Sequence, residues 1–207
     1  ERGEKCLLLS EEMSFRLVGK RLLKRITSLG EDVWDNSINK LRDDAYAWRQ
    51  GREQFYVSRP CGTIAKAVQT IERAVRDGVQ CVFVDYAQLL RGQGNGMYEQ
   101  CSDVSMRLRE LTSAHELVLF CLCQLSRKSE EHEGKPLMSD LKNSGQFEQD
   151  ADVILFLDWP SVRGVSEAPG DEYWIRVRKN RNRDTLVGDV KLSVSRRTQT
   201  ISSLGAD

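Results

Sequence analysis

The sequence predicts an α/β fold in which helices flank a mostly parallel sheet. Residues 79–84 are apolar apart from Gln80, which is typical of a strand buried on both faces. A second apolar run, at residues 117–123, predicts another strand. Segments with helical periodicity lie between the strands, and such alternation implies parallel strands joined by right-handed crossovers.

The first half of the chain shows this alternation clearly. Apolar residues recur on one side of a helix that Ser14 caps and Gly30 stops. In a later helix, five side chains are expected to face inward: Ile64, Ala67, Val68, Ile71 and Val75. In order, the expected elements are a strand at residues 5–9, helices at residues 14–29 and 32–49, a strand at residues 55–57 and a helix at residues 63–76.

The second half continues with the strand that ends at Asp85, a helix at residues 98–115 and the strand that ends at Gln124. The remaining strands are expected near Val153, Ile175, Val190 and Thr200, with a loop at residues 160–170. The last of them predict an antiparallel hairpin added at one edge of the sheet. A length of 207 residues without a Pro/Gly/Ser-rich linker predicts one domain.

Composition limits the classes of function without selecting one. Lys plus Arg and Asp plus Glu both number 31, so any nucleic-acid binding must use a local basic surface. Basic residues outnumber acidic ones between Glu172 and Arg197, although most of them can equally form a solvated strand face. No apolar run is long enough to span a bilayer and no secretory signal is present, so no membrane partner is expected.

The six cysteines do not predict a disulfide framework. Cys81, Cys121 and Cys123 lie in apolar strands, where a free cysteine behaves as a small hydrophobe. The Cys-x-Cys spacing lacks the spacer of zinc knuckles, so a metal site with His115 or His132 is not expected. The cysteines indicate a reducing, cytoplasmic location.

Asp85 follows its apolar run at the point where the strand should end. In open α/β sheets, ligands bind beyond the carboxyl ends of the strands. Many nucleotide-hydrolysing enzymes place an aspartate there to hold Mg²⁺, directly or through water. From this pattern alone, a carboxylate that caps the next turn is an equally good interpretation.

Four motifs together resemble the DnaB-type replicative DNA helicases. They are Asp85-Tyr86-Ala87-Gln88-Leu89, the strand end Gln124-Leu125-Ser126-Arg127, the loop from Ser139 through Gly145 to Asp152, and Lys179-Asn180-Arg181-Asn182. The loop is long and specific, and the resemblance extends from about Gly3 to Ile201. It implies a RecA-like three-layer motor domain that binds ATP and Mg²⁺. It also implies a homo-hexamer that translocates on single-stranded DNA at replication forks, with a helicase loader and a primase as further partners.

The P-loop pattern G-x-x-x-x-G-K-[ST] occurs nowhere in these residues. In the family it lies just before the strand that matches residues 5–9. We therefore expect residues 1–207 to be a motor domain that begins just after its P-loop strand and helix, with the P-loop upstream of Glu1. The alternative is a degenerate relative. Without the P-loop amides and lysine, the β- and γ-phosphates lose their main cradle.

The segment Ser10-Glu11-Glu12-Met13-Ser14 is similar to the family's Ser-Leu-Glu-Met-Ser. The resemblance assigns Glu12 as the base that orients and deprotonates the attacking water, with Glu11 in the place of an apolar residue. Without the resemblance, both glutamates would be favourable charges at a helix N-terminus.

Gln124 matches the polar residue that senses the γ-phosphate in the family. An amide can donate a hydrogen bond to a phosphate oxygen and accept one from water, so it can report whether that oxygen is present. The alternative is a strand-end amide whose hydrogen bonds are satisfied by the backbone.

Lys142, Asn143 and Gly145 match the loop that family members place in the central channel of the ring, where it grips the single-strand backbone. A lysine for phosphate, a polar amide and a glycine that admits close approach suit this task. The family often has Arg-Glu at the first two positions. Without the resemblance, Lys-Asn-Ser-Gly predicts only a turn.

Lys179 and Arg181 match the basic pair that reaches the nucleotide of the neighbouring subunit, as an arginine finger does. Alternate residues on a strand share a face, so the two side chains are expected to act together. Arg183 stands where the family usually has a glycine, which leaves the geometry of the following turn open.

Two other functions stay open. A recombinase- or clock-type ATPase would use the same fold, although the loop that ends at Asp152 argues against it. A catalytically dead scaffold that binds DNA or a loader without hydrolysing ATP is supported only by the missing P-loop. A P-loop sequence upstream of Glu1 would remove the scaffold hypothesis.

Overall fold

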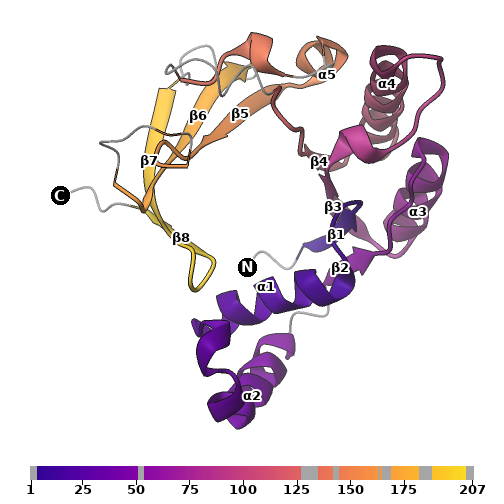
Figure 1. Ribbon diagram of the computed structural model, residues 1–207. Coiled ribbons are helices and arrows are strands. Elements are labelled where there is room, and N and C mark those ends of the chain that lie inside the picture. The colour runs from indigo at the N-terminus through magenta and orange to yellow at the C-terminus, as the bar shows by residue number, and fades with distance from the viewer. Residues whose placement is uncertain are drawn as a thin grey trace. The chain divides into compact units, whose positions relative to one another are not determined.

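The computed structural model describes residues 4–50, 54–126, 135–141, 145–162, 164, 169–181 and 188–203. The chain divides into two compact units (Figure 1). The parallel-sheet unit comprises the described parts of Glu1–Val18, Arg49–Leu125 and Leu141–Asp150. The antiparallel-sheet unit comprises those of Gly19–Trp48, Ser126–Asp140 and Ala151–Asp207.

The sheet of the first unit has four parallel strands in the order β2-β1-β3-β4. The strands are β1 (Lys5–Ser10), β2 (Phe55–Ser58), β3 (Val79–Asp85) and β4 (Val118–Cys121). Helix α3 (Ile64–Arg76) connects β2 to β3, and helix α4 (Met97–His115) connects β3 to β4. The short helix α5 (Gly145–Asp150) also belongs to this unit. The predicted alternation and the parallel sheet are confirmed.

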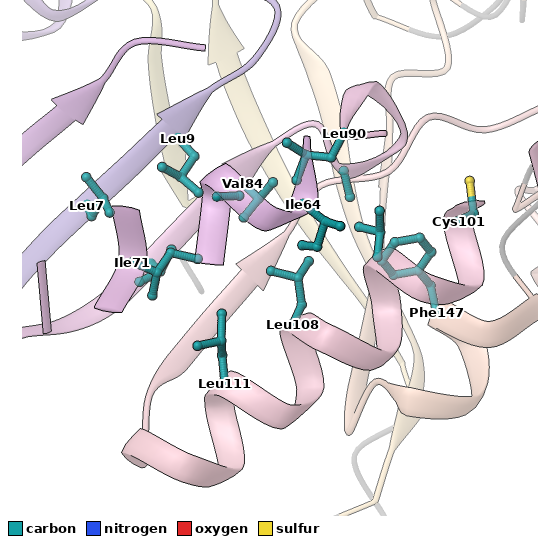
Figure 2. Close-up of a cluster of buried hydrophobic side chains, with 14 of the residues drawn as sticks. Leu7, Leu9, Ile64, Ile71, Val84, Leu90, Cys101, Leu108, Leu111 and Phe147 are labelled. Carbon is teal, nitrogen blue, oxygen red and sulfur yellow. The ribbon is translucent and has the colours of Figure 1, made fainter. Parts of the chain in front are cut away.

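The core of the parallel-sheet unit joins one face of the sheet to α3 and α4 (Figure 2). Strands β1 and β3 pair so that Leu9 lies beside Val84, and both side chains are fully buried. Of the five side chains that the periodicity of α3 predicts to face inward, Ile64, Ala67 and Ile71 are buried. Val68 and Val75 are half-buried and pack against the same core. Burial of one such aliphatic side chain contributes roughly 1.5–3 kcal/mol, so this layer fixes the strands that lead to the sheet edge.

The opposite face of the sheet is covered less completely by the described residues. Phe83 of β3 is half-buried, and its ring stacks on that of Phe120 with 4.8 Å between the centroids. Phe120 itself is 45% exposed. The prediction that β3 is buried on both faces therefore holds fully only for the face that α3 and α4 cover.

The second unit contains an antiparallel sheet that is larger than the predicted hairpin. Its four strands pair in sequence order and are β5 (Val153–Asp158), β6 (Glu172–Asn180), β7 (Gly188–Ser195) and β8 (Thr200–Ser203). Along β5, Ile154 and Phe156 are buried while Val153, Leu155 and Leu157 are exposed. This period of two is the pattern of a strand with one covered face.

Most of helices α1 (Phe15–Thr27) and α2 (Ile38–Arg49) belongs to the second unit. The sequence predicted a helix from residue 32, but two 3₁₀ turns, Glu31–Val33 and Asp35–Ser37, precede α2. Asp, Asn and Ser side chains favour such turns because they compete for the backbone hydrogen bonds of a helix interior. Across the described ranges, no helix has the length and apolar character needed to cross a membrane.

Candidate functional site

The candidate site lies at the carboxyl ends of the parallel strands. Ser10, the last residue of β1, pairs with Asp85, the last residue of β3. One residue further, the Glu11 N–H donates a 2.8 Å hydrogen bond to the Asp85 carbonyl. The structure thus brings Glu12 and Asp85 to neighbouring strand ends, as parallel strands require.

The turn that carries Glu12 is closed by local hydrogen bonds. The Ser10 hydroxyl donates to the Met13 carbonyl at 2.9 Å, and Ser14 starts α1 with its hydroxyl accepting from the Leu17 N–H at 3.4 Å. Glu12 is exposed and precedes α1, whose first turn contains no acidic residue. Glu12 thus lies just outside α1, two residues before the capping Ser14.

Asp85 does not cap the turn that follows it. The next turn is the 3₁₀ segment Ala87–Leu89, whose N-cap Tyr86 makes no side-chain capping bond. Within the described part of the chain, the carboxylates of Glu12 and Asp85 form no hydrogen bond or ion pair. Both carboxylates are therefore available to a ligand at this edge.

The segment that follows β4 is held at the same edge of the sheet by backbone hydrogen bonds to the end of β3 and the residues after it. The Leu122 N–H donates to the Val84 carbonyl, and the Ala87 N–H donates to the Leu122 carbonyl, both at 3.0 Å. Two residues further, the Gln88 side chain takes the place of a backbone partner. Its amide nitrogen donates to the Gln124 carbonyl and its oxygen accepts from the Gln124 N–H, each at 3.1 Å.

These two hydrogen bonds between the Gln88 side chain and the Gln124 backbone help to distinguish two interpretations of the Gln124 side chain. The alternative to a phosphate sensor was an amide satisfied by the backbone. The backbone-bonded amide is instead that of Gln88, whereas the exposed Gln124 side chain makes no hydrogen bond with the described residues. Sequence reasoning did not single out Gln88, although it lies inside the motif that follows β3.

Glu11 is the second residue that sequence reasoning missed. Its carboxylate accepts hydrogen bonds from the Cys61 N–H at 2.9 and 3.0 Å and from the Gly62 N–H at 2.8 Å. Burial and the nearby Glu11 carboxylate raise the pKa of the Cys61 thiol. A charge in the place of an apolar residue was the only signal in the sequence.

The basic pair lies in the antiparallel-sheet unit. Lys179 is in β6, opposite Ile154 of β5. Strand β6 ends at Asn180, so Arg181 lies one residue beyond it and is not a strand residue as predicted. The Arg181 N–H donates to the Asp152 carbonyl at 2.8 Å, and its guanidinium pairs with the Asp152 carboxylate at 3.4 Å.

A bulge determines the face on which Lys179 lies. Ile154 is opposite Lys179, but the next residue, Leu155, is opposite Val177, so Arg178 has no partner in the β5 ladder. Such an extra residue shifts the alternation of side chains by one position. Lys179 therefore lies on the same face as Arg176 and not on the opposite one.

A network of ion pairs holds the bulged part of β6. The buried Arg176 guanidinium donates to Asp158 at 2.7 Å and to Asp189 at 2.6 Å, and Arg178 donates to Asp189 at 2.8 Å. Hydrogen bonds from Lys135 and the two arginines hold the pKa of the Asp189 carboxyl well below its usual range. Removal of one partner would leave an uncompensated buried charge, which is strongly destabilising. The network therefore fixes the part of β6 that precedes Lys179.

The predicted DNA loop is only partly described. Lys142 and Asn143 lie outside the described residues, whereas Gly145 is the first residue of α5. The last residue of α5, Asp150, accepts hydrogen bonds from Ser105 at 2.8 Å and Arg109 at 2.9 Å, both on α4. The helix that follows the loop is therefore anchored to the core.

The strand-end residues fit the groups of an Mg²⁺-nucleotide. Magnesium prefers oxygen ligands and usually takes one or two carboxylates together with phosphates and water. The single carboxylate of Asp85 matches this habit, and the described residues contain no denser cluster of metal ligands. An edge with two carboxylates and one amide suits an Mg²⁺-bound phosphate group.

These features define an α/β protein with a candidate ligand site at the carboxyl edge of its parallel sheet. A family model, DnaB-like helicase C terminal domain, matches residues 1–203. The chain belongs to this family, which confirms the resemblance that its motifs predicted.

Relatives that match in sequence support the same family assignment. A probable plasmid replicative DNA helicase of Chlamydia trachomatis is 34% identical over 161 residues, which cover 72% of this chain and 35% of that protein. The replicative DNA helicase DnaB of Rickettsia felis is 29% identical over 154 residues, which cover 72% and 31%. The chain spans about a third of the length of these relatives.

Solved structures share the fold. A DnaB-like replicative helicase, solved in a study of its interactions with primase, superposes with a TM-score of 0.87 at 24% identity, covering 98% of this chain and 52% of that one. A KaiC-like protein of Pyrococcus horikoshii gives a TM-score of 0.65 at 12% identity, covering 99% and 77%. Since both superpose, the fold alone does not separate the DnaB-like helicases from the KaiC-like protein; the family model does.

Proposed function

We propose that this chain is the ATP-hydrolysing motor of a replicative DNA helicase that works as a hexameric ring on single-stranded DNA. The observation that carries the proposal is the meeting of Glu12, Asp85 and Gln124 at adjacent ends of β1, β3 and β4. These three side chains are of the types that hold Mg²⁺, activate water and contact the γ-phosphate in phosphoanhydride hydrolysis.

Each residue has a separate task in this mechanism. Mg²⁺, when bound, neutralises charge on the phosphate oxygens. The Asp85 carboxylate would hold the ion, directly or through water. Glu12 orients a water in line with the γ-phosphorus and accepts its proton, and Gln124 donates an N–H to a γ-phosphate oxygen. Lys179 and Arg181 stabilise charge on the nucleotide of the neighbouring subunit.

The partners follow from the same proposal. Single-stranded DNA is held by Lys142, Asn143 and Gly145 in the channel of the ring. A loader and a primase are further partners, and the primase is supported by the interactions described for the solved DnaB-like helicase that shares this fold. The protein works in the cytoplasm, where its six free cysteines remain reduced.

The first test is nucleotide binding. These 207 residues contain no P-loop pattern, so on their own they should bind ATP-Mg²⁺ weakly and hydrolyse it negligibly. Calorimetric titration with a non-hydrolysable ATP analogue measures the affinity, and the intact protein serves as the comparison. Micromolar binding by the 207 residues alone would contradict the dependence of phosphate affinity on a P-loop. An intact protein without DNA-stimulated ATPase would leave only the scaffold hypothesis.

The second test is DNA binding. In the intact hexamer, Lys142→Ala should weaken single-strand binding to a similar degree for all sequences, because a phosphate contact carries no sequence information. It should also reduce the salt slope by roughly 0.7 for each phosphate that the lysine no longer neutralises. Binding titrations at several salt concentrations check both effects. Unchanged affinity and slope would leave this stretch as a structural turn.

A further inference from the structure

Glu11 is held at both ends, next to the proposed base. Its N–H donates to the Asp85 carbonyl at 2.8 Å, which joins β1 to β3 beyond their last paired residues. Its carboxylate crosses to the other neighbour of β1 and accepts from the N–H groups of Cys61 and Gly62, in the segment after β2. Glu12 follows directly on this doubly held residue.

The segment that Glu11 holds is itself tied to the edge of the sheet. The Arg91 N–H donates to the Gly62 carbonyl at 3.2 Å, and the Ile64 N–H donates to the Arg91 carbonyl at 3.0 Å. Gly62 has a φ of +69°, a conformation that side chains disfavour. Two successive N–H groups that converge in this way form an anion-binding concavity, and here the anion is a side chain of the protein itself.

We propose that Glu11 is a positioning residue for hydrolysis, and this inference rests on the proposed function. The Glu11 N–H joins the ends of β1 and β3, and its carboxylate joins the end of β1 to the segment after β2. The carboxylate thereby fixes the turn from which the Glu12 carboxylate reaches the attacking water. A leucine, the residue that the family's Ser-Leu-Glu-Met-Ser places here, accepts no hydrogen bond. The leucine should therefore fail in this chain, because the Cys61 and Gly62 N–H groups would lose their acceptor.

Three variants of the intact protein test the proposal. Glu11→Leu removes the acceptor. Glu11→Gln keeps one oxygen, and a single oxygen can serve both groups because Oε2 of Glu11 lies 3.0 Å from the Cys61 nitrogen and 2.8 Å from the Gly62 nitrogen. Glu110→Leu is the matched control, since Glu110 is an exposed glutamate of α4 that makes no hydrogen bond with the described residues.

Two measurements are made on each variant, amide hydrogen exchange at Cys61 and Gly62 and steady-state ATPase kinetics. In Glu11→Leu, exchange should accelerate and kcat should fall about ten- to a hundred-fold at unchanged KM, as expected when a reacting group is displaced by about an ångström. Glu11→Gln should lie between Glu11→Leu and the wild type in both measurements. Glu110→Leu should match the wild type.

The outcomes separate this inference from the proposed function. A wild-type protein without ATPase refutes the proposed function, and the positioning role is refuted with it. An active wild type whose Glu11→Leu variant keeps its kcat refutes only the positioning role, as does a raised KM at constant kcat. If Glu11→Leu does not fold, Glu11→Gln decides alone: accelerated exchange with normal kcat would show that the clamp is merely structural.

Discussion

Glu12→Gln in the intact protein is expected to lower kcat for ATP hydrolysis by about 10²–10⁴-fold, the usual contribution of a general base. Glutamine has nearly the same shape but cannot accept the proton of the attacking water. Because Glu12 makes no hydrogen bond with the described residues, the change should leave the fold and the affinity for nucleotide intact. Asp85→Asn should abolish turnover as well, but by weakening Mg²⁺-dependent nucleotide binding.

Single-turnover ATPase and nucleotide titration with and without Mg²⁺ separate the two effects. Glu110→Gln and Asp35→Asn are matched controls, because both positions are exposed and make no hydrogen bond or ion pair with the described residues. If Glu12→Gln hydrolyses ATP at the wild-type rate, Glu12 is not the base. The three strand ends would then hold nucleotide without carrying the chemistry.

The parallel part of this fold could be predicted because its cause is local in the sequence. The spacing of Ile64, Ala67 and Ile71 identifies the inner face of α3, and an apolar run identifies β3. Adjacent parallel strands end at the same edge, so the meeting of Glu12 and Asp85 follows once the strands are assigned. Strand assignment alone does not give these residues a role, because many proteins end an apolar strand in an aspartate. The roles were predicted from the resemblance of the motifs to the family.

The contacts that arrange the site could not be predicted, because one partner in each is a backbone group far away in the sequence. The Glu11 carboxylate binds N–H groups 50 and 51 residues away, and Gln88 binds the backbone of a residue 36 positions away. Every residue carries such backbone groups, so the sequence contains no mark of which ones are used. The bulge at Arg178 could not be predicted for a similar reason, because a shift in register depends on the partner strand.

The basic pair leads to the prediction with the largest effect. Rings made only of Arg181→Ala subunits, or only of Glu12→Gln subunits, should be inactive. A trans-acting arginine contributes about 10³–10⁵-fold in rate, so its loss alone should abolish measurable ATPase. Both variants should retain nucleotide binding at least partly. The pair between Arg181 and Asp152 is exposed at 43% and 69%, so its removal should cost the fold little. Lys179→Ala should behave as Arg181→Ala does.

Mixing the two inactive proteins tests whether the pair acts in trans. In a randomly assembled equal mixture, roughly a quarter of the head-to-tail interfaces join an intact Glu12 to an intact Arg181 of the neighbour. Basal ATPase should then return to a comparable fraction of the wild-type rate, while unwinding can stay absent because translocation needs successive sites to fire in order. Mass analysis must show that the rings contain both variants. If such mixed rings stay as inactive as their parents, Lys179 and Arg181 do not serve the nucleotide of a neighbouring subunit.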